Sequence, residues 1–154
     1  MDEHMFSSKV EQQTDTYTVT FYNGNVKYIE DTVTAGQPVN KPEIDPVRVG
    51  YNFAGWYRDS SCTIRHVFSE AVNGDISLYA SWVHRTYHVR FDACEFAHPS
   101  TQVVVHGTYV LEPDVSYPGY IMEGWYTDET YTNRYNFNTK VTGPLCLYAK
   151  WIPL

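Results

Sequence analysis

The stretch that decides the fold is Gly50–Tyr57, GYNFAGWY, because it returns as Gly119–Tyr126, GYIMEGWY. The shift between Trp56 and Trp125 is 69 residues (125 − 56). A second stretch, residues 74–82 (GDISLYASW), returns at the same shift as residues 143–151 (GPLCLYAKW). Self-similarity at one long period is the signature of tandem modules. The chain of 154 residues is therefore predicted to fold as two repeats rather than as one domain.

The strand pattern at the start of each repeat sets the module boundaries. Residues 17–21 (YTVTF) return as residues 87–91 (YHVRF), and the last shared aromatic residues are Trp82 and Trp151. We expect modules at 17–82 and 87–151, a linker at 83–86, a flexible leader at 1–16 and a short C-terminal end at 152–154. So short a connection predicts end-to-end stacking of the modules with little freedom.

Each module is predicted to be mostly β, in the α+β range, with little or no helix. Alternation of apolar and polar residues over 17–21 predicts a first strand. The Asn23-Gly24 pair favours a tight hairpin to a second strand at 27–33, whereas the second copy lacks this turn and is expected to have a different loop. Prolines at positions 38, 42 and 46 exclude a long helix from the next connection. Third and fourth strands are expected at 50–57 and 76–82.

Aromatic residues are expected to form the core of each module. A unit of this size buries only about 60% of its unfolded surface, and each buried aromatic side chain removes roughly 150–250 Å² from water. The aromatic content of 16% meets that requirement. The residues assigned structural roles are Gly55, Trp56, Phe68 and Trp82, with Gly124, Trp125, Phe137 and Trp151 in the second copy.

Strand alternation leaves the position of one tryptophan in each copy open. It places Trp56 and Tyr79, and likewise Trp125 and Tyr148, on the face opposite the apolar stripes. The loop at 58–72, or 127–141 in copy two, could cover that face with Phe68 or Phe137. A bulge at Gly55 or Gly124 would instead reverse the alternation. Burial is the preferred interpretation; the alternative is an open aromatic strip in which these four aromatic residues bind a ligand.

Charge argues against polyanionic partners. The formal net charge is −7, and no segment carries clustered Lys or Arg. Nucleic acids and anionic membrane surfaces both require such clusters, so neither is an expected partner. Because no apolar run approaches the roughly 18 residues of a membrane span, we expect no membrane contact from this segment.

No residue pattern points to catalysis. The chain has no nucleophile elbow, no phosphate-binding glycine loop and no His-Glu-x-x-His motif. Asp59 and Asp128 recur together with Arg65 and Arg134, and we interpret each Asp–Arg set as an ion pair that fixes a loop. The odd set of Cys62, Cys94 and Cys146 favours three unpaired thiols over one bridge. We expect no catalytic residue, no metal, no cofactor and no enzymatic activity.

These positions carry a family resemblance. The order Val33-x-x-Gly36, Pro42, Gly50–Tyr57, Phe68 and Ile76–Trp82 resembles the Listeria–Bacteroides repeat, also called the internalin-type B repeat. The resemblance covers residues 17–82 and 87–151, as two tandem copies. Copy two departs from the pattern with Met122 in place of Phe53 and with no glycine in its first turn. The resemblance implies a β-grasp-like module with a small mixed sheet.

The same resemblance supplies the functional expectation. It implies non-enzymatic repeat modules of a bacterial cell-surface or secreted protein, acting as a spacer or stalk with adhesion as a further role. The implied partners are other modules of the same parent protein and a host or matrix protein or glycan, and the implied location is extracellular or at the cell surface. The alternative from a different class is a carbohydrate- or protein-binding module that uses an exposed aromatic face.

Overall fold

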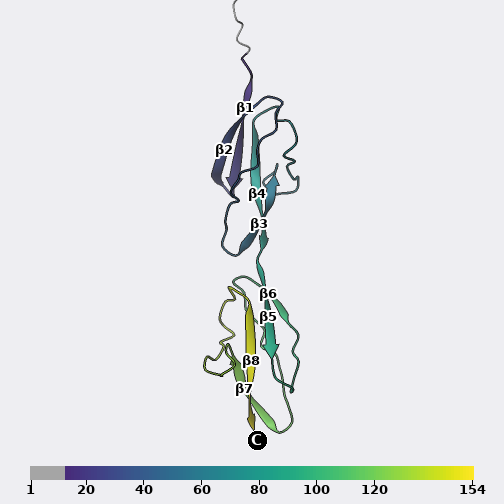
Figure 1. Ribbon diagram of the computed structural model, residues 1–154, viewed down its shortest axis with the longest axis vertical. Helices are drawn as coiled ribbons and strands as arrows, with labels where there is room; N and C mark the ends of the chain where they lie inside the picture. Colours follow the sequence, from purple (N-terminus) through teal and green to yellow (C-terminus); the bar gives the residue numbers. More distant parts are fainter. Residues whose placement is uncertain (1–12) are drawn as a thin grey trace, which may run out of the picture. The chain divides into compact units, whose positions relative to one another are not determined.

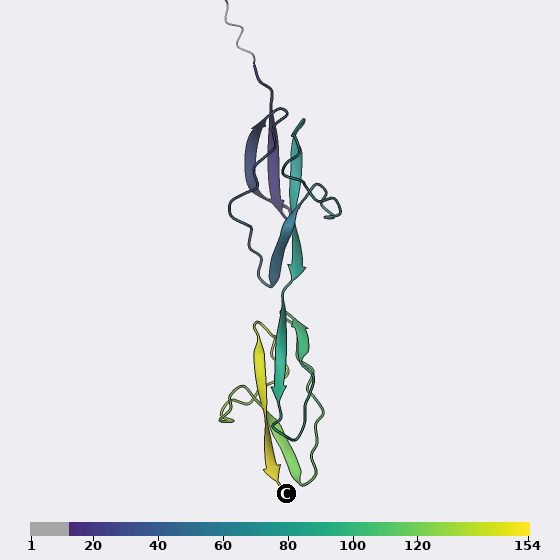
Figure 2. The same ribbon diagram turned by 45° about the vertical axis from the view of Figure 1, so that its right-hand side comes forward.

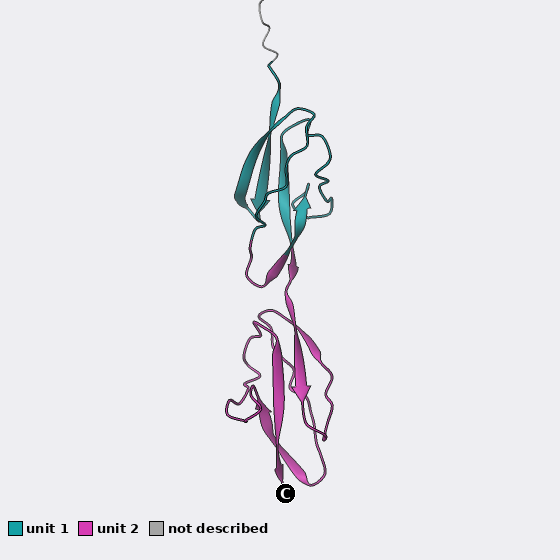
Figure 3. Ribbon diagram, viewed as in Figure 1, with its two compact units in different colours: residues 1–46, 53–81 teal, residues 47–52, 82–154 magenta. Residues whose placement is uncertain are grey.

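The computed structural model describes residues 13–154, which form two compact units (Figure 3). One unit contains the described residues up to Pro46 together with Phe53–Ser81, and the other contains Val47–Asn52 and Trp82–Leu154. Most of the predicted leader, residues 1–12, lies outside the described residues, and Thr16 is the first residue of a strand. Residues 47–52 belong to the second unit although the repeat pattern places them in the first copy.

The first copy forms a four-stranded sheet from β1 (Thr16–Asn23), β2 (Val26–Thr34), β3 (Tyr51–Tyr57) and β4 (Ile76–His84) (Figure 1). The strand order is β2-β1-β4-β3. The two central strands run parallel, with Phe21 opposite Leu78, whereas β1 and β2 are antiparallel. This mixed sheet confirms the predicted fold class for the first copy.

The second copy repeats this topology with β5 (Thr86–Asp92), β6 (Gln102–Val105), β7 (Tyr120–Tyr126) and β8 (Leu145–Pro153). The order is β6-β5-β8-β7, with β5 parallel to β8 and β7 antiparallel to it. All regular elements in residues 13–154 are strands, so no helix there has the length and hydropathy to cross a membrane. Two small, mostly β modules are therefore confirmed.

The first hairpin differs between the copies, as predicted. In copy one, Gly24 adopts φ 63° between paired residues Asn23 and Val26. In copy two, residues 93–101 separate β5 from β6, and Cys94 adopts φ 56° with its N–H donating to Asp92 Oδ1 at 2.9 Å. Because the longer loop replaces part of the hairpin, β6 has 4 residues where β2 has 9.

The core of each copy lies on one face of its sheet. Phe21 and Leu78 come from the parallel pair and are 1% and 0% exposed, and the Phe21 ring meets Trp56 edge-on at 4.9 Å. In copy two the corresponding ring contact joins Phe91 and Trp125 at 5.2 Å. Such aromatic pairs stabilise a core by about 0.5–1.5 kcal/mol beyond their buried area.

Backbone hydrogen bonds also tie the long connections to the strands. Val72 exchanges two bonds with the end of the β2 turn: its N–H donates to Gln37 O and its carbonyl accepts from Gly36 N–H, both at 2.9 Å. Val141 makes the same two bonds with Thr108 and Gly107 at 2.8 Å. Both valines are buried. The connections are therefore packed parts of each module, although they have no regular secondary structure.

Candidate functional site

A recurring glycine in the third strand of each copy lies directly before a buried tryptophan, and in β7 the strand carries a bulge there. In β7, the pairing with β8 passes from Met122↔Trp151 to Gly124↔Lys150, so Glu123 is an extra residue. In β3, Gly55 adopts φ 110° at the matching position, a conformation that favours glycine. An extra residue reverses the alternation of side chains beyond it.

Trp56 and Trp125 consequently lie in the cores, each only 1% exposed. Their burial, the preferred interpretation from the sequence, is confirmed. Strict alternation alone would have placed them on the same face as Tyr79 and Tyr148. Of the possibilities left open by the sequence, the bulge accounts for the burial. An indole so enclosed cannot stack on a ligand, and the proposed aromatic strip loses its two tryptophans.

The tyrosines that remain on the outer face differ between the copies. Tyr79 stacks on Tyr22 at 5.5 Å with 17° between the rings, and both side chains are half-buried. At the matching position of copy two, Tyr148 lies opposite Asp92 instead of a tyrosine. A hydrogen bond with the Cys146 thiol, followed by the charge of that group, raises the pKa of Tyr148 to about 12. The stacked pair is thus a property of copy one alone.

The feature that both copies share next to the bulge is a loop organised by an aspartate. Asp59 Oδ1 accepts from the N–H groups of Thr63 and Ile64 at 2.9 and 2.8 Å, and Asp59 Oδ2 accepts from Thr63 Oγ1 at 2.7 Å. The loop closes with Arg58 N–H donating to Ile64 O and His66 N–H donating to Trp56 O. In Figure 2 the chain forms a compact loop directly after β3.

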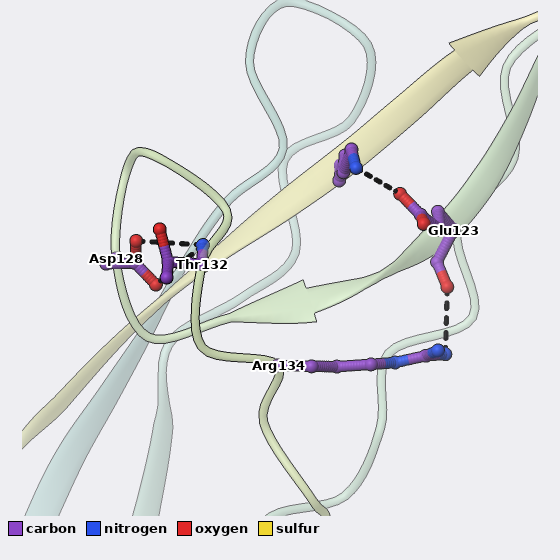
Figure 4. Close-up of polar contacts among 5 residues, drawn as sticks. Glu123, Asp128, Thr132 and Arg134 are labelled. Atoms are coloured by element: carbon purple, nitrogen blue, oxygen red, sulfur yellow. Dashed lines mark hydrogen bonds and ion pairs between the residues drawn. The ribbon is translucent and has the colours of Figure 1, made fainter.

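Copy two builds the same loop around Asp128 (Figure 4). Its Oδ2 accepts from Thr132 N–H at 2.9 Å and its Oδ1 from Asn133 N–H at 2.7 Å, and the Thr130 hydroxyl also donates to this carboxylate. Cys62 and Tyr131 adopt φ 54° and 56° at the same place in the two loops. The sequence predicted a loop fixed by each aspartate but not these hydrogen bonds, although the recurring spacing of Asp59 with Thr63 and Asp128 with Thr132 was a signal for them.

The predicted ion pairs between these aspartates and the recurring arginines were wrong. Arg134 Nη2 donates instead to the bulge carbonyl, Glu123 O, at 2.9 Å, while the Glu123 carboxylate pairs with Lys150 at 2.8 Å (Figure 4). Arg65 lies over Gly55 in the same way, with its Nη2 3.2 Å from the place of a β-carbon there. The aspartates instead accept hydrogen bonds from backbone N–H groups that converge inside the loop.

These contacts set the charge state of the loop carboxylates. Hydrogen bonds from the Thr130 hydroxyl and from the backbone of Asn133 and Thr132 lower the pKa of Asp128 to about 2. Bonds from Ile64 N–H and the Thr63 side chain also lower the pKa of Asp59. A general base works best with a pKa near the operating pH. Both carboxylates are arranged to hold backbone rather than to exchange protons at neutral pH.

The remaining structural candidates lie at the margins of the cores. Phe68 and Phe137 are half-buried, with Phe68 edge-on to His66 at 4.7 Å and Phe137 edge-on to Tyr135 at 5.0 Å. Trp82 and Trp151 are also half-buried, and Trp151 Nε1 donates to Ala93 O at 3.2 Å. The three cysteines, Cys62, Cys94 and Cys146, are free thiols.

An open groove of about 440 Å³ runs beside the second bulge, between residues 112–115 and β7. Glu112 and Asp114 contribute acidic side chains, and Arg134 contributes a guanidinium group. Trp125 borders the groove but is 1% exposed and offers no stacking surface. Within residues 13–154, no three His, Cys, Asp or Glu side chains converge in a way that could hold a metal ion. The groove is therefore lined by charged side chains, but its lining does not indicate a particular reaction.

Two small mixed sheets with the same strand order, the same glycine beside a buried tryptophan and the same aspartate loop define a tandem-repeat protein. The model of the Listeria-Bacteroides repeat domain matches residues 17–81 and 87–150. The chain belongs to this family, as two consecutive copies.

Two longer proteins of Evansella cellulosilytica resemble the chain. One, called "Putative membrane protein", is 33% identical over 139 residues, which are 88% of this chain and 21% of the relative. The other, called "Putative Gly-rich membrane protein", is 31% identical over 137 residues, which are 84% of this chain and 16% of that relative. The chain thus spans about a fifth or less of the length of these relatives.

Proposed function

We propose that the two modules serve as a non-enzymatic spacer or stalk within a bacterial cell-surface or secreted protein, with adhesion as a further role. The location would be extracellular, and the partners would be other modules of the same parent protein and a host or matrix protein or glycan. The family membership and the longer relatives named as membrane proteins support this proposal.

The main support for the proposal is that the residues repeated in both copies are structural ones. The side chains repeated in both copies hold the module together: the buried tryptophan, the glycine of the bulge and the aspartate of the loop. The outer-face pair Tyr22–Tyr79 does not recur, because Asp92 stands at the place of Tyr22. A binding function common to both modules would require its contact residues to recur, whereas a spacer requires only the scaffold.

The spacer role can be tested by measuring distance distributions across the chain. A fluorescent donor fused before residue 13 and an acceptor fused after Leu154 would report the end-to-end distance by time-resolved energy transfer. A Gly/Ser linker of equal length is the control, since such linkers behave as flexible coils. We expect a distribution clearly narrower than that of the linker. A distribution as broad as that of the control would contradict the spacer role.

The alternative, a carbohydrate- or protein-binding module, is favoured only by the stacked Tyr22–Tyr79 pair. Two adjacent half-buried rings on the face away from the core offer a flat surface of the kind on which a sugar ring packs. Titration of the chain with soluble oligosaccharides, followed by the NMR signals of these two tyrosines, tests it. Saturable shifts that disappear in Tyr79→Ala would support binding, and unchanged signals would reject it.

A further inference from the structure

One end of the second unit carries an aromatic cluster with no counterpart in the first copy. The Phe96 ring lies 4.3 Å from Tyr117, stacked at 23°, and 4.6 Å from Tyr120, and it meets Trp151 edge-on at 5.5 Å. Tyr117 is 39% exposed. We call the surface formed by Phe96, Tyr117, Gly119, Tyr120, Ile121 and Leu154 the terminal patch.

The terminal patch is apolar where the first copy is polar. At the 69-residue shift, Tyr117, Ile121 and Leu154 take the places of Arg48, Asn52 and Arg85. Arg48 lies over the Tyr51 ring at 4.1 Å, and Arg85 Nε donates to Asn52 Oδ1 at 3.2 Å. Ile121 and Leu154 are 55% and 84% exposed. A change from charged and polar side chains to exposed apolar ones indicates a surface that contacts another apolar group.

The backbone beneath the two sets of side chains is the same. Leu154 N–H donates to Gly119 O at 2.9 Å, and Arg85 N–H donates to Gly50 O at 2.8 Å. Gly119 and Gly50 adopt φ 84° and 80°. The two glycines are therefore equivalent positions, and any difference around them comes from what packs against them.

The two glycines differ in whether a side chain lies against them. All residues concerned, 47–52 and 82–154, belong to the second unit. A β-carbon added to Gly50 would lie 2.7 Å from Cδ2 of His106, whereas one added to Gly119 would meet nothing within 4 Å. His106 lies in the turn that follows β6, where Tyr87 Oη hydrogen-bonds its Nδ1 at 3.0 Å and its N–H donates to Arg85 O at 2.8 Å. The first glycine thus has a partner turn that the second does not.

We infer that the terminal patch is the docking surface for a further repeat module, in which the turn after the second strand seats a planar side chain on Gly119 as His106 sits on Gly50. The inference rests on the proposed function. In the docked state, the N–H of that turn bonds Leu154 O, as the His106 N–H bonds Arg85 O. Tyr117, Ile121 and Leu154 then lose exposed apolar surface, which strengthens the contact relative to the polar set in copy one.

The experiment appends a second copy of residues 86–154 directly after Leu154 and compares this extended chain with the chain of 154 residues. Gly119→Ala should raise the unfolding equilibrium constant of residues 82–154 about tenfold more in the extended chain, because the added β-carbon meets the docked turn. The control is Gly107→Ala, which has a similar φ of 79° and nothing within 4 Å. It should cost the same in both chains.

Amide hydrogen exchange on the unsubstituted chains gives a second readout that does not depend on the variants folding. Residues 117–121 should exchange more slowly in the extended chain. Equal exchange, or an equal cost of Gly119→Ala in both chains, would overturn the inference, as would dimerisation of the shorter chain through Tyr117 in sedimentation. The energy-transfer measurement on the chain of 154 residues tests the spacer role separately, so either idea can fail alone.

Discussion

The guanidinium group of Arg134 lies so close to Gly124 that a β-carbon on this glycine would be 2.8 Å from Arg134 Nε and 3.1 Å from Cζ. In copy one the corresponding distance, from Gly55 to Arg65 Nη2, is 3.2 Å, but Gly55 also adopts φ 110°. The two copies therefore require glycine at the bulge for different reasons. Copy one requires it for backbone conformation, and copy two requires it for space.

This difference predicts that removing the neighbouring arginine side chain relieves the cost of a Gly→Ala substitution in copy two but not in copy one. Gly124→Ala should displace Arg134 and break its bond to Glu123 O, which costs roughly 0.5–1.5 kcal/mol of stability. In a chain that already carries Arg134→Ala, this bond is absent, so Gly124→Ala should add little further cost. Gly55→Ala should cost about 1–3 kcal/mol through backbone strain, and Arg65→Ala should leave that cost in place. Urea unfolding of the four single and two double variants measures these effects. Equal rescue in both copies would contradict the distinction.

The glycine bulge also marks the limit of what the sequence could predict. The repeat at a shift of 69 residues was sufficient to predict two modules, four strands in each and an aromatic core, because periodicity and repetition depend on side-chain type. The direction of Trp125 depends on one extra residue, Glu123, in the strand, and local alternation cannot show whether such an insertion is present. The partners of Asp59 and Asp128 were predicted wrongly because charge complementarity suggested the nearby arginines, whereas unpaired backbone N–H groups compete for the same carboxylate.

The buried indoles predict a clear stability effect. Trp56→Phe should destabilise copy one by about 1–3 kcal/mol, because the smaller ring leaves part of the space between Phe21 and Phe53 unfilled. Tyr109→Phe, at a side chain that is 50% exposed, is the control and should change stability little. Chemical denaturation followed by NMR signals of each copy measures both. Iodide should quench Trp56 and Trp125 poorly in the folded chain, and efficient quenching of either would contradict the sealed cores.

The aspartate loops predict a loss of stability in acid. The folded-state pKa of Asp128 is about 2, against an ordinary value of 3.8, so its contribution is fully present above pH 3.8 and is lost as the pH falls toward 2. Asp59 has the same sign. Asp128→Asn should lower stability at pH 7 and flatten its dependence between pH 5 and about 2. Glu129→Gln, next in sequence but without these backbone bonds, is the matched control. An unchanged acid profile in Asp128→Asn would show that the loop does not depend on the carboxylate.

A second pH effect, at higher pH, comes from His66 and should be confined to copy one. His66 is 5% exposed, and desolvation, followed by the nearby positive charge of Arg58, lowers its pKa from the ordinary value of 6.5. Arg58 Nε approaches His66 Nδ1 at 3.4 Å, Glu70 pairs with Arg58, and Phe68 covers the ring. The unfolded chain therefore binds this proton more readily than the folded chain.

Stability of copy one should accordingly be highest above about pH 6.5 and fall as the pH is lowered toward the folded-state pKa of His66. Copy two has Tyr135 at this position, with the same backbone bond to its tryptophan. His66→Tyr should thus remove the decline between pH 7 and 5 while the backbone stays in place. His88→Gln, at an exposed histidine, is the control. Urea midpoints of copy one across this range measure the effect, and a decline that persists in His66→Tyr would assign it to another group.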